Sequence, residues 1–147
     1  MVNSIKKGKS FEREIANLLT ENTGFKFYRV PQSGAFATNN NSEDSRFDGD
    51  VFSEHESFQK VVIECKSYSS FSINDFFNPK SLLFKWIKQA ETECRNKHWL
   101  LFFKINNKGV YLIHGLLVDD TVFLLNKLDK SDCLQFGDCY KLYRLKI

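Results

Sequence analysis

The stretch Lys60–Ser67 joins a hydrophobic strand pattern to two charged residues. It begins with β-branched apolar residues, which favour a buried strand. Because side chains alternate along a strand, Glu64 and Lys66 share one face with Val62, whereas the thiol of Cys65 points to the other face. A charge buried beside apolar residues is costly unless it meets a partner, which invites a functional interpretation. Taken alone, however, the stretch favours the simpler interpretation that a strand leaves the core here and ends in solvent.

A second carboxylate precedes this stretch by one hairpin-like connection. Asp50 begins a short strand pattern, and the connection Ser53–Gln59 returns the chain toward Glu64. Two acids on neighbouring strands repel each other, and a divalent cation between them is the common physical remedy. The alternative is that both acids lie at exposed strand ends. The spacing therefore opens a metal-site hypothesis and leaves the alternative open.

A helix near the N-terminus could supply a further acid. Ser10 is predicted to cap a helix whose apolar residues recur at helical spacing and which ends near Asn22–Gly24. Glu12 and Glu14 flank its apolar stripe on opposite sides, so either carboxylate could reach a site built against the helix. A glutamate at such a boundary more commonly faces solvent. The aromatic-rich segment Phe25–Val30 then predicts a strand that ends at a proline.

The rest of the chain predicts a second helix and several strands. Asn78 and Pro79 provide a helix start, and the apolar run Trp99–Lys104 predicts a central strand that is covered on both faces. A hairpin turn follows, Asp120 is expected to cap a short helix, and the tail Tyr140–Leu145 is expected to add an edge strand. The order helix, strands, helix, strands, helix predicts an α/β or α+β layer with a small mixed sheet.

Composition is typical of a single soluble domain. The 147 residues fit one domain, residues 1–147, and a hydrophobic content of 42% suffices for a real core. The net charge of +3 is too small to identify a nucleic-acid binder by itself. The cysteines show no zinc-ligand spacing, and no apolar run approaches the roughly 20 residues that span a bilayer. The sequence therefore predicts a soluble, cytoplasmic protein with no membrane partner.

Three polar regions could contact nucleic acid. Lys6, Lys7 and Lys9 form a basic tract near the N-terminus, and Lys88 lies on the outer face of the second predicted helix. Such lysines could bind phosphate, although a solvated terminus or helix face is their more common role. The Asn-rich segment 37–45 has too little apolar content to pack, and long loops inside compact domains are often functional.

The combined pattern resembles the motif of the PD-(D/E)XK nuclease superfamily, in which an Asp precedes a Glu-x-Lys by one hairpin. Asp50, Glu64 and Lys66 occupy the motif positions. Gly49 stands where the family motif has a proline, which is a departure from the pattern. The short motif gains weight from the helix that precedes it and from the strand pattern around it.

Over roughly residues 7 to 118 the chain is also similar to archaeal-type Holliday junction resolvases. Lys7–Arg13 resembles their N-terminal K-G-x-x-x-E-R signature, which selects Glu12 over its neighbour two residues on. Arg29–Gly34 is similar to their R-x-P-x-S-G loop, and Lys88–Glu91 to the Q-A segment of their second helix. The Asn-rich insertion, the modest charge and a divergent C-terminus depart from that family.

This resemblance implies a restriction-endonuclease-like core, an α/β fold in which a central mixed β-sheet is flanked by helices. It implies one or two Mg²⁺ ions, with Mn²⁺ able to substitute. The implied ligands are Asp50, Glu64, the carbonyl of Cys65 and Glu12, because Mg²⁺ prefers hard oxygen ligands. Lys66 would orient the attacking water or balance charge on the phosphate in the transition state.

The resemblance also implies further catalytic and DNA-binding side chains. Ser33 and Gln89 would hold a phosphate or a water beside the catalytic residues. The DNA-binding residues expected are Lys6, Lys7, Lys9, Arg29, Ser33 and Lys88. The partner would be DNA in the form of a four-way junction, whose two-fold symmetry suits a homodimer.

Other interpretations stay open at this stage. A sequence-specific DNA endonuclease of the restriction or homing type would share the fold and read DNA with the Asn-rich insertion. A catalytically silent nucleic-acid-binding module would keep the fold, although the presence of Glu12, Asp50, Glu64 and Lys66 speaks against it. A purely structural domain would gain no stability from a divalent metal.

Overall fold

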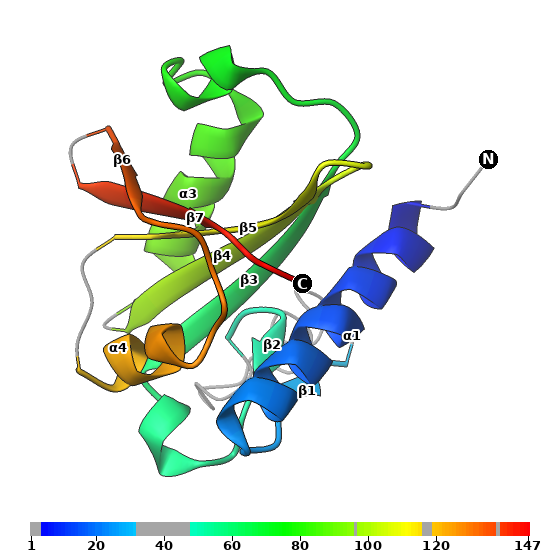
Figure 1. Cartoon of the computed structure of the whole chain (residues 1–147), viewed down its shortest axis with the longest axis vertical. Coiled ribbons are helices and arrows are strands. Elements are labelled where there is room, and N and C mark those ends of the chain that lie inside the picture. Colours follow the sequence, from blue (N-terminus) through cyan, green and yellow to red (C-terminus); the bar gives the residue numbers. More distant parts are fainter. Residues whose placement is uncertain (1–3, 32–47, 96, 116–118, 138) are drawn as a thin grey trace.

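A seven-stranded mixed sheet forms the centre of the computed structural model, which describes residues 4–31, 48–95, 97–115, 119–137 and 139–147 (Figure 1). In spatial order the strands are β1 (Tyr28–Arg29), β2 (Val51–Phe52), β3 (Val61–Tyr68), β4 (His98–Ile105), β5 (Gly109–His114), β7 (Tyr140–Arg144) and β6 (Leu134–Phe136). β3 and β4 pair in parallel, and the other named neighbours pair antiparallel. The predicted mixed sheet is confirmed.

Helices cover both faces of this sheet. Figure 1 shows α1 (Ser4–Thr23) and α3 (Leu82–Glu93) on opposite sides, and α4 (Asp119–Asn126) adds its apolar residues to the α1 side. Each face has its own hydrophobic cluster, so apolar side chains of the central strands alternate between the two clusters. The predicted α/β core with flanking helices is therefore confirmed. Two short 3-10 helices, η2 (Glu56–Phe58) and η3 (Ile73–Phe76), complete the described elements before β4.

The apolar run predicted as a central strand is the most deeply buried part of the sheet. It forms β4, which is the fourth of the seven strands and in which residues 100–103 are fully buried. The predicted hairpin to β5 is also confirmed. Asn107 and Gly109 both adopt positive φ angles in its turn, which suits their residue types.

The first helix begins earlier than its capping signal predicted. It starts at Ser4, so Ser10 lies inside the helix and the predicted cap at that residue is wrong. The lysines before Ser10 are good helix formers, so the helix continues through them toward the N-terminus and Ser10 does not cap it. The predicted end is confirmed, because Gly24 adopts φ +80° and its N–H donates to the carbonyl of Thr20. None of the helices in the described ranges combines the length and the apolar character that a membrane span requires.

Several other boundaries also differ from the predictions. The strand expected over Phe25–Val30 has only the two residues of β1, because its pairing with β2 is equally short. The second helix begins at Leu82, after an N-cap at Ser81 whose Oγ accepts the N–H of Phe84, and not at Asn78 and Pro79. The short helix α4 begins at Asp119, which places Asp120 inside it and makes the predicted cap wrong.

The C-terminal strand lies inside the sheet and not at its edge. β7 pairs with β5 on one side and with β6 on the other, so β6 is the edge strand. Gly137, at φ +60°, lies in the connection that turns β6 back toward β7. The residues of β6 are mostly exposed polar or isolated apolar positions, which gave no strand pattern in the sequence.

Candidate active site

The strand β3 carries charge into the buried part of the sheet. Val62 belongs to the cluster beneath α3, whereas Ile63 and Cys65 belong to the cluster beneath α1. The alternation places Glu64 and Lys66 on the α3 face, as the sequence predicted. Glu64 is only 4% exposed and Lys66 is half-buried. The opening interpretation of a solvated strand end is therefore wrong for Glu64.

Asp50 is fixed against this strand by its backbone and its side chain. Its N–H donates to the carbonyl of Ile63 at 2.7 Å, and its Oδ2 accepts the N–H of Cys65 at 2.8 Å. The register of β2 on β3 pairs Val51 with Ile63, so Asp50 lies beside Glu64. The predicted approach of these two acids is present in the structure.

Gly49 explains the departure from the proline of the family motif. It adopts φ +86°, which proline cannot reach, and a Cβ at this position would lie 2.7 Å from the carbonyl oxygen of Ile63. The residue before it, Asp48, pairs with Lys97 at 3.6 Å and with Arg95 at 3.8 Å. A turn that requires glycine therefore positions Asp50 at the site.

Glu64 is in an environment that disfavours its charged form. Burial, and then repulsion by Asp50 and Glu93, raise the pKa of Glu64 from 4.5 to about 9, while the charge of Lys66 acts in the opposite direction. Its Oε1 is buried and has no hydrogen-bond partner among the described residues. A buried carboxylate with an unpaired oxygen is one that a cation would stabilise.

The Cys65 thiol lies at the point where the predicted charges converge. Burial raises the pKa of the Cys65 thiol well above its ordinary value, and Asp50, Glu12 and Glu64 raise it further, whereas Lys66 lowers it. The structure thus brings all four predicted catalytic charges around one residue of β3. The thiol itself is in the apolar cluster beneath α1, so only the main chain of Cys65 is available to a polar ligand.

The two glutamates of α1 lie in different environments. Glu12 is 9% exposed, and the guanidinium of Arg29 lies 3.5 Å from its Oε2 and also donates to the carbonyl of Val30. Glu14 is half-exposed and pairs with Lys104 at 3.0 Å. Glu12 acts on the pKa of Cys65, whereas Glu14 is paired with Lys104. Arg29, expected to bind DNA, is held against Glu12 in this structure.

A fourth acid of the candidate site, Glu93, was not anticipated from the sequence. Glu93 of α3 is close enough to raise the pKa of Glu64, and its Oε1 accepts a hydrogen bond of 2.9 Å from Nε2 of Gln89. Gln89 is exposed on α3 and reaches the site through this contact. The signal was present, because Glu93 follows Gln89 by four residues and shares its helix face.

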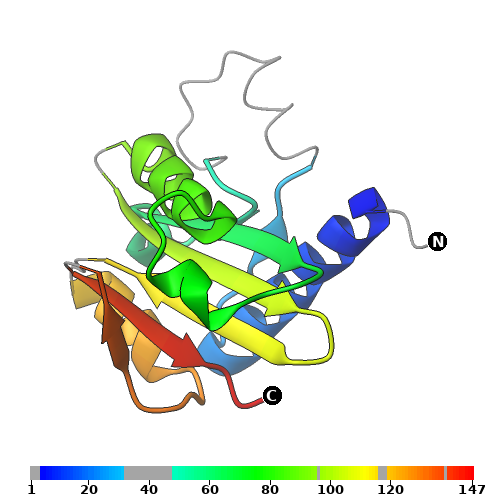
Figure 2. The same cartoon turned by 90° about the horizontal axis from the view of Figure 1, so that it is seen from above.

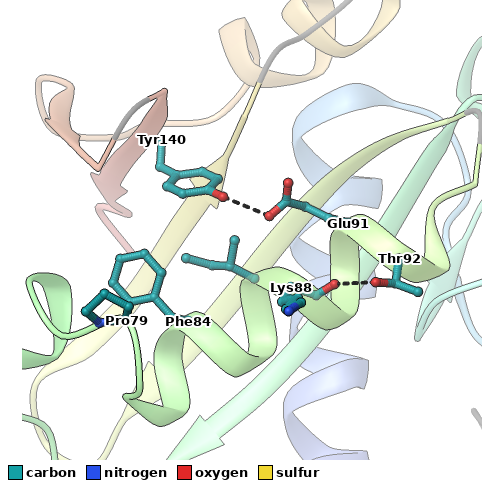
Figure 3. A pocket seen from close by; sticks show the side chains of 7 residues that line it. Pro79, Phe84, Lys88, Glu91, Thr92 and Tyr140 are labelled. Carbon is teal, nitrogen blue, oxygen red and sulfur yellow. Dashed lines mark hydrogen bonds between the residues drawn. The ribbon is translucent and has the colours of Figure 1, made fainter.

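Lys88 lies on the outer face of α3 beside a hollow of about 440 Å³ (Figure 3). The hydroxyl of Tyr140 donates to Oε1 of Glu91 across this hollow at 2.8 Å, and Oγ1 of Thr92 donates to the carbonyl of Lys88. Lys88 and Gln89 also line a second, smaller hollow of about 290 Å³ that extends to Glu93. Lys88 and Glu93, one of the acids that raise the pKa of Glu64, thus line the same hollow.

The remaining predicted DNA-binding residues are partly outside this constellation. Lys6, Lys7 and Lys9 are exposed on the first turns of α1. Ser33 and the Asn-rich segment 37–45 lie outside the described residues.

The chemistry of the acids suits a hard divalent cation. No group of three or more His, Cys, Asp or Glu side chains forms a ready metal-ligand cluster within the described ranges. The fit rests instead on Glu64, whose buried Oε1 lacks a partner there, and on Asp50 beside it. Both offer the carboxylate oxygens that Mg²⁺ and Mn²⁺ prefer, and the cation would offset their mutual repulsion.

Comparison with known proteins finds a family that matches most of this chain. The family described as "Phage putative PDDEXK endonuclease" matches residues 3–131 of the chain. Protein D14 of Escherichia phage T5 is 35% identical over 142 residues, which cover 87% of this chain and 85% of that protein. No solved structure matches the chain. The matched region contains every candidate catalytic residue named above.

Proposed function

Because the chain belongs to the phage PD-(D/E)XK endonuclease family, we propose that it is a metal-dependent endonuclease that hydrolyses phosphodiester bonds in branched DNA. The observation that carries this proposal is the burial of the Glu64 carboxyl group beside a second acid. The Glu64 carboxyl group is 4% exposed, lies beside Asp50 and leaves Oε1 without a hydrogen-bond partner among the described residues, so its charged form costs stability unless a cation binds. The resemblance to the family motif supports a metal at this position.

The metal ligands proposed are Asp50, Glu64, the carbonyl of Cys65 and Glu12. When bound, a divalent cation supplies Lewis acidity to the phosphate and makes water more acidic near neutral pH. The hydrogen bond from the N–H of Cys65 fixes the orientation of the Asp50 carboxylate. The ion pair with Arg29 similarly fixes Glu12. The chain thus holds two of its acids in place before any ligand arrives.

Lys66 is proposed to act on the reacting phosphate and water. Its ammonium lies on the same face of β3 as Glu64 and favours the charged form of that carboxylate. From this face it orients the attacking water or stabilises the charge that develops on the phosphate oxygens. Gln89, which donates a hydrogen bond to Glu93, holds a water or a phosphate oxygen at the edge of the site.

Branched DNA is the substrate that the resemblance to junction resolvases favours. Four-way junctions carry two-fold symmetry, and a homodimer would place two of these sites on opposed strands. The exposed lysines of α1 and Lys88 of α3 lie on either side of the acids and supply phosphate contacts.

Cleavage of matched DNA substrates tests this function directly. A four-way junction, a flap and a linear duplex, built from overlapping strands, are incubated with the protein and Mg²⁺ or Mn²⁺, with Glu64→Gln as the inactive control. We expect paired, symmetric nicks in the junction and little cleavage of the duplex. Equal cleavage of all three overturns the preference for branched DNA, and cuts at fixed duplex sequences indicate a sequence-specific endonuclease. No cleavage of any substrate with either metal overturns the nuclease proposal itself.

A further inference from the structure

A small polar pocket lies between the N-terminal half of α1 and the carboxyl ends of β3 and β4, next to the candidate active site. We propose that it binds one phosphate group of the nucleic-acid backbone, an inference that rests on the proposed function. The pocket measures about 170 Å³. It is lined by Lys7, Ser10, Phe11, Glu14, Ser67, Lys104 and Asn106. Its volume is below the range of drug-sized ligand sites and suits one small polar group.

Lys104 is the residue that makes this pocket unusual. It lies on β4, the central strand, on the face that otherwise carries the buried Leu100 and Phe102. Its Nζ lies 3.0 Å from Oε2 of Glu14 and 6.0 Å from the ring centroid of Phe11. The ammonium is therefore held in one place at the rim of the core, with 43% of the side chain exposed.

The other lining groups complete a set that can donate hydrogen bonds to an anion. Ser67 lies opposite Lys104 in the parallel register, so its hydroxyl and the ammonium come from adjacent strand ends. Ser10 and Lys7 approach from α1, and Asn106 adds an amide from the turn after β4. Two lysines against one glutamate leave the pocket positive, which favours an anion over a metal ion.

The position of the pocket relative to the acids suits a continuous DNA strand. Ser67 lies on the α1 face of β3, the face from which Glu12 approaches, and it follows Cys65 by two residues, a separation of about 7 Å. A phosphate in the pocket would therefore belong to a nucleotide close to the one whose phosphate is cleaved. Figures 1 and 2 both show the first turns of α1 beside this end of the sheet (Figure 2).

Glu14 occupies the place of the phosphate when no DNA is bound. Its carboxylate pairs with the same ammonium that a phosphate would use. Phosphate oxygens and Glu14 therefore compete for Lys104, and loss of the Glu14 charge strengthens DNA binding. An increase in DNA affinity on loss of the Glu14 charge distinguishes a phosphate site from a surface ion pair that only supports the fold.

Binding of a labelled DNA junction in EDTA, followed by fluorescence anisotropy from 50 to 200 mM salt, tests the pocket without cleavage. Lys104→Gln is compared with Lys60→Gln, which removes an exposed lysine just before the opposite end of β3. We expect Lys104→Gln to weaken binding about fivefold and to lower the salt slope by about 0.9, the value of one duplex phosphate contact. Lys60→Gln should leave the slope unchanged, and Lys104→Arg should restore most of the affinity.

The acidic side of the pocket gives an opposite expected result. Glu14→Gln should tighten binding about threefold, whereas Glu21→Gln, which removes an exposed acid at the far end of α1, should change it less. Thermal unfolding of each variant confirms that it is folded, and the tighter binding of Glu14→Gln cannot result from misfolding. Equal slopes for Lys104→Gln and Lys60→Gln overturn the pocket while leaving the proposed function intact. If the wild-type protein binds no DNA, the proposed function fails instead.

Discussion

The neighbouring strands β3 and β4 are similarly buried in the sheet, but they carry different types of side chain at paired positions. Each has eight residues, and their parallel register pairs Glu64 with Leu101 and Lys66 with Phe103. Leu101 is fully buried among apolar side chains. Glu64 is almost as deeply buried, but it carries a carboxylate with an unpaired oxygen as far as the described residues show.

This difference separates what the fold needs from what the site needs. A sheet position at this depth is most stable with an apolar side chain, as β4 shows along most of its length. Nothing in the packing of β3 requires an acid at Glu64, and its burial costs stability. We therefore attribute the acid to the chemistry of the site. A change at Glu64 in β3 should act mainly on cleavage, and a change at Leu101 in β4 should act mainly on the stability of the fold.

The largest expected effect is the loss of cleavage in Glu64→Gln. Glutamine keeps the shape of the side chain but removes the charge that is proposed to bind the metal. We expect cleavage of the junction to fall at least 1,000-fold, which corresponds to about 4 kcal/mol of transition-state stabilisation. Single-turnover cleavage in saturating Mg²⁺ measures this effect. Glu54→Gln, an exposed acid, is the matched control, and more than a tenth of wild-type activity in Glu64→Gln would contradict the assignment.

Leu101→Ala should act on the fold and not on the chemistry. Removing a fully buried leucine leaves a cavity beneath α3 and lowers the free energy of unfolding by about 2–5 kcal/mol. Urea denaturation measures the loss. At a temperature where the variant stays folded, it should keep cleavage within a few-fold of wild type. A loss of cleavage as large as that of Glu64→Gln, with folding intact, would remove the contrast between the strands.

Divalent metal should stabilise the wild-type protein through β3. Binding of Mg²⁺ or Mn²⁺ to the native state alone adds about 2.7 kcal/mol at a concentration 100-fold above the Kd. Thermal unfolding in EDTA and in either metal should therefore show a higher Tm for wild type and a much smaller shift for Glu64→Gln. Equal shifts in both proteins would place the metal elsewhere.

In the absence of metal, Glu64 should make stability fall as the pH rises. The pKa of this carboxyl is about 9 in the folded chain and 4.5 when unperturbed, so the folded protein binds more protons between these values. The contribution of Glu64 to stability is then highest near or below pH 4.5 and declines toward pH 9, by up to about 1.4 kcal/mol per pH unit. Glu64→Gln lacks this decline.

The comparison to make is therefore between wild type and Glu64→Gln in EDTA at two pH values. We expect the variant to be more stable than wild type by at least about 1 kcal/mol at pH 8 and nearly equal to it at pH 4. Urea denaturation at each pH gives the difference. A variant that is less stable than wild type at pH 8 would show that the Glu64 carboxylate is well compensated without metal.

Local patterns in the sequence predicted the centre of the molecule well. The alternation of side chains in Val61–Lys66 placed Glu64 and Cys65 on the correct faces, because the period of a strand is fixed by its backbone. The apolar run of β4 predicted a doubly covered strand for the same reason. Asp50 and Glu64 followed from a motif whose spacing depends on one short connection, and Glu12 followed from the resemblance of Lys7–Arg13 to a family signature.

Non-local pairing set the limits of that prediction. The interior place of β7 depends on β6, whose exposed residues carry no strand signal. Glu93 joins Glu64 only because α3 crosses the sheet at that point, and the pairing of Arg29 with Glu12 depends on how β1 meets α1. Such contacts are decided by tertiary packing, which residue types and spacing alone do not specify.

The hydrogen bond from the N–H of Cys65 to Asp50 gives this protein a built-in spectroscopic probe. That amide proton reports directly on the carboxylate that a metal would use. Its ¹H–¹⁵N resonance should shift when cation charge is placed on Asp50, while amides deeper in β4 stay where they are. Occupation of the site can thus be followed at a single backbone signal, without a substrate and without any cleavage.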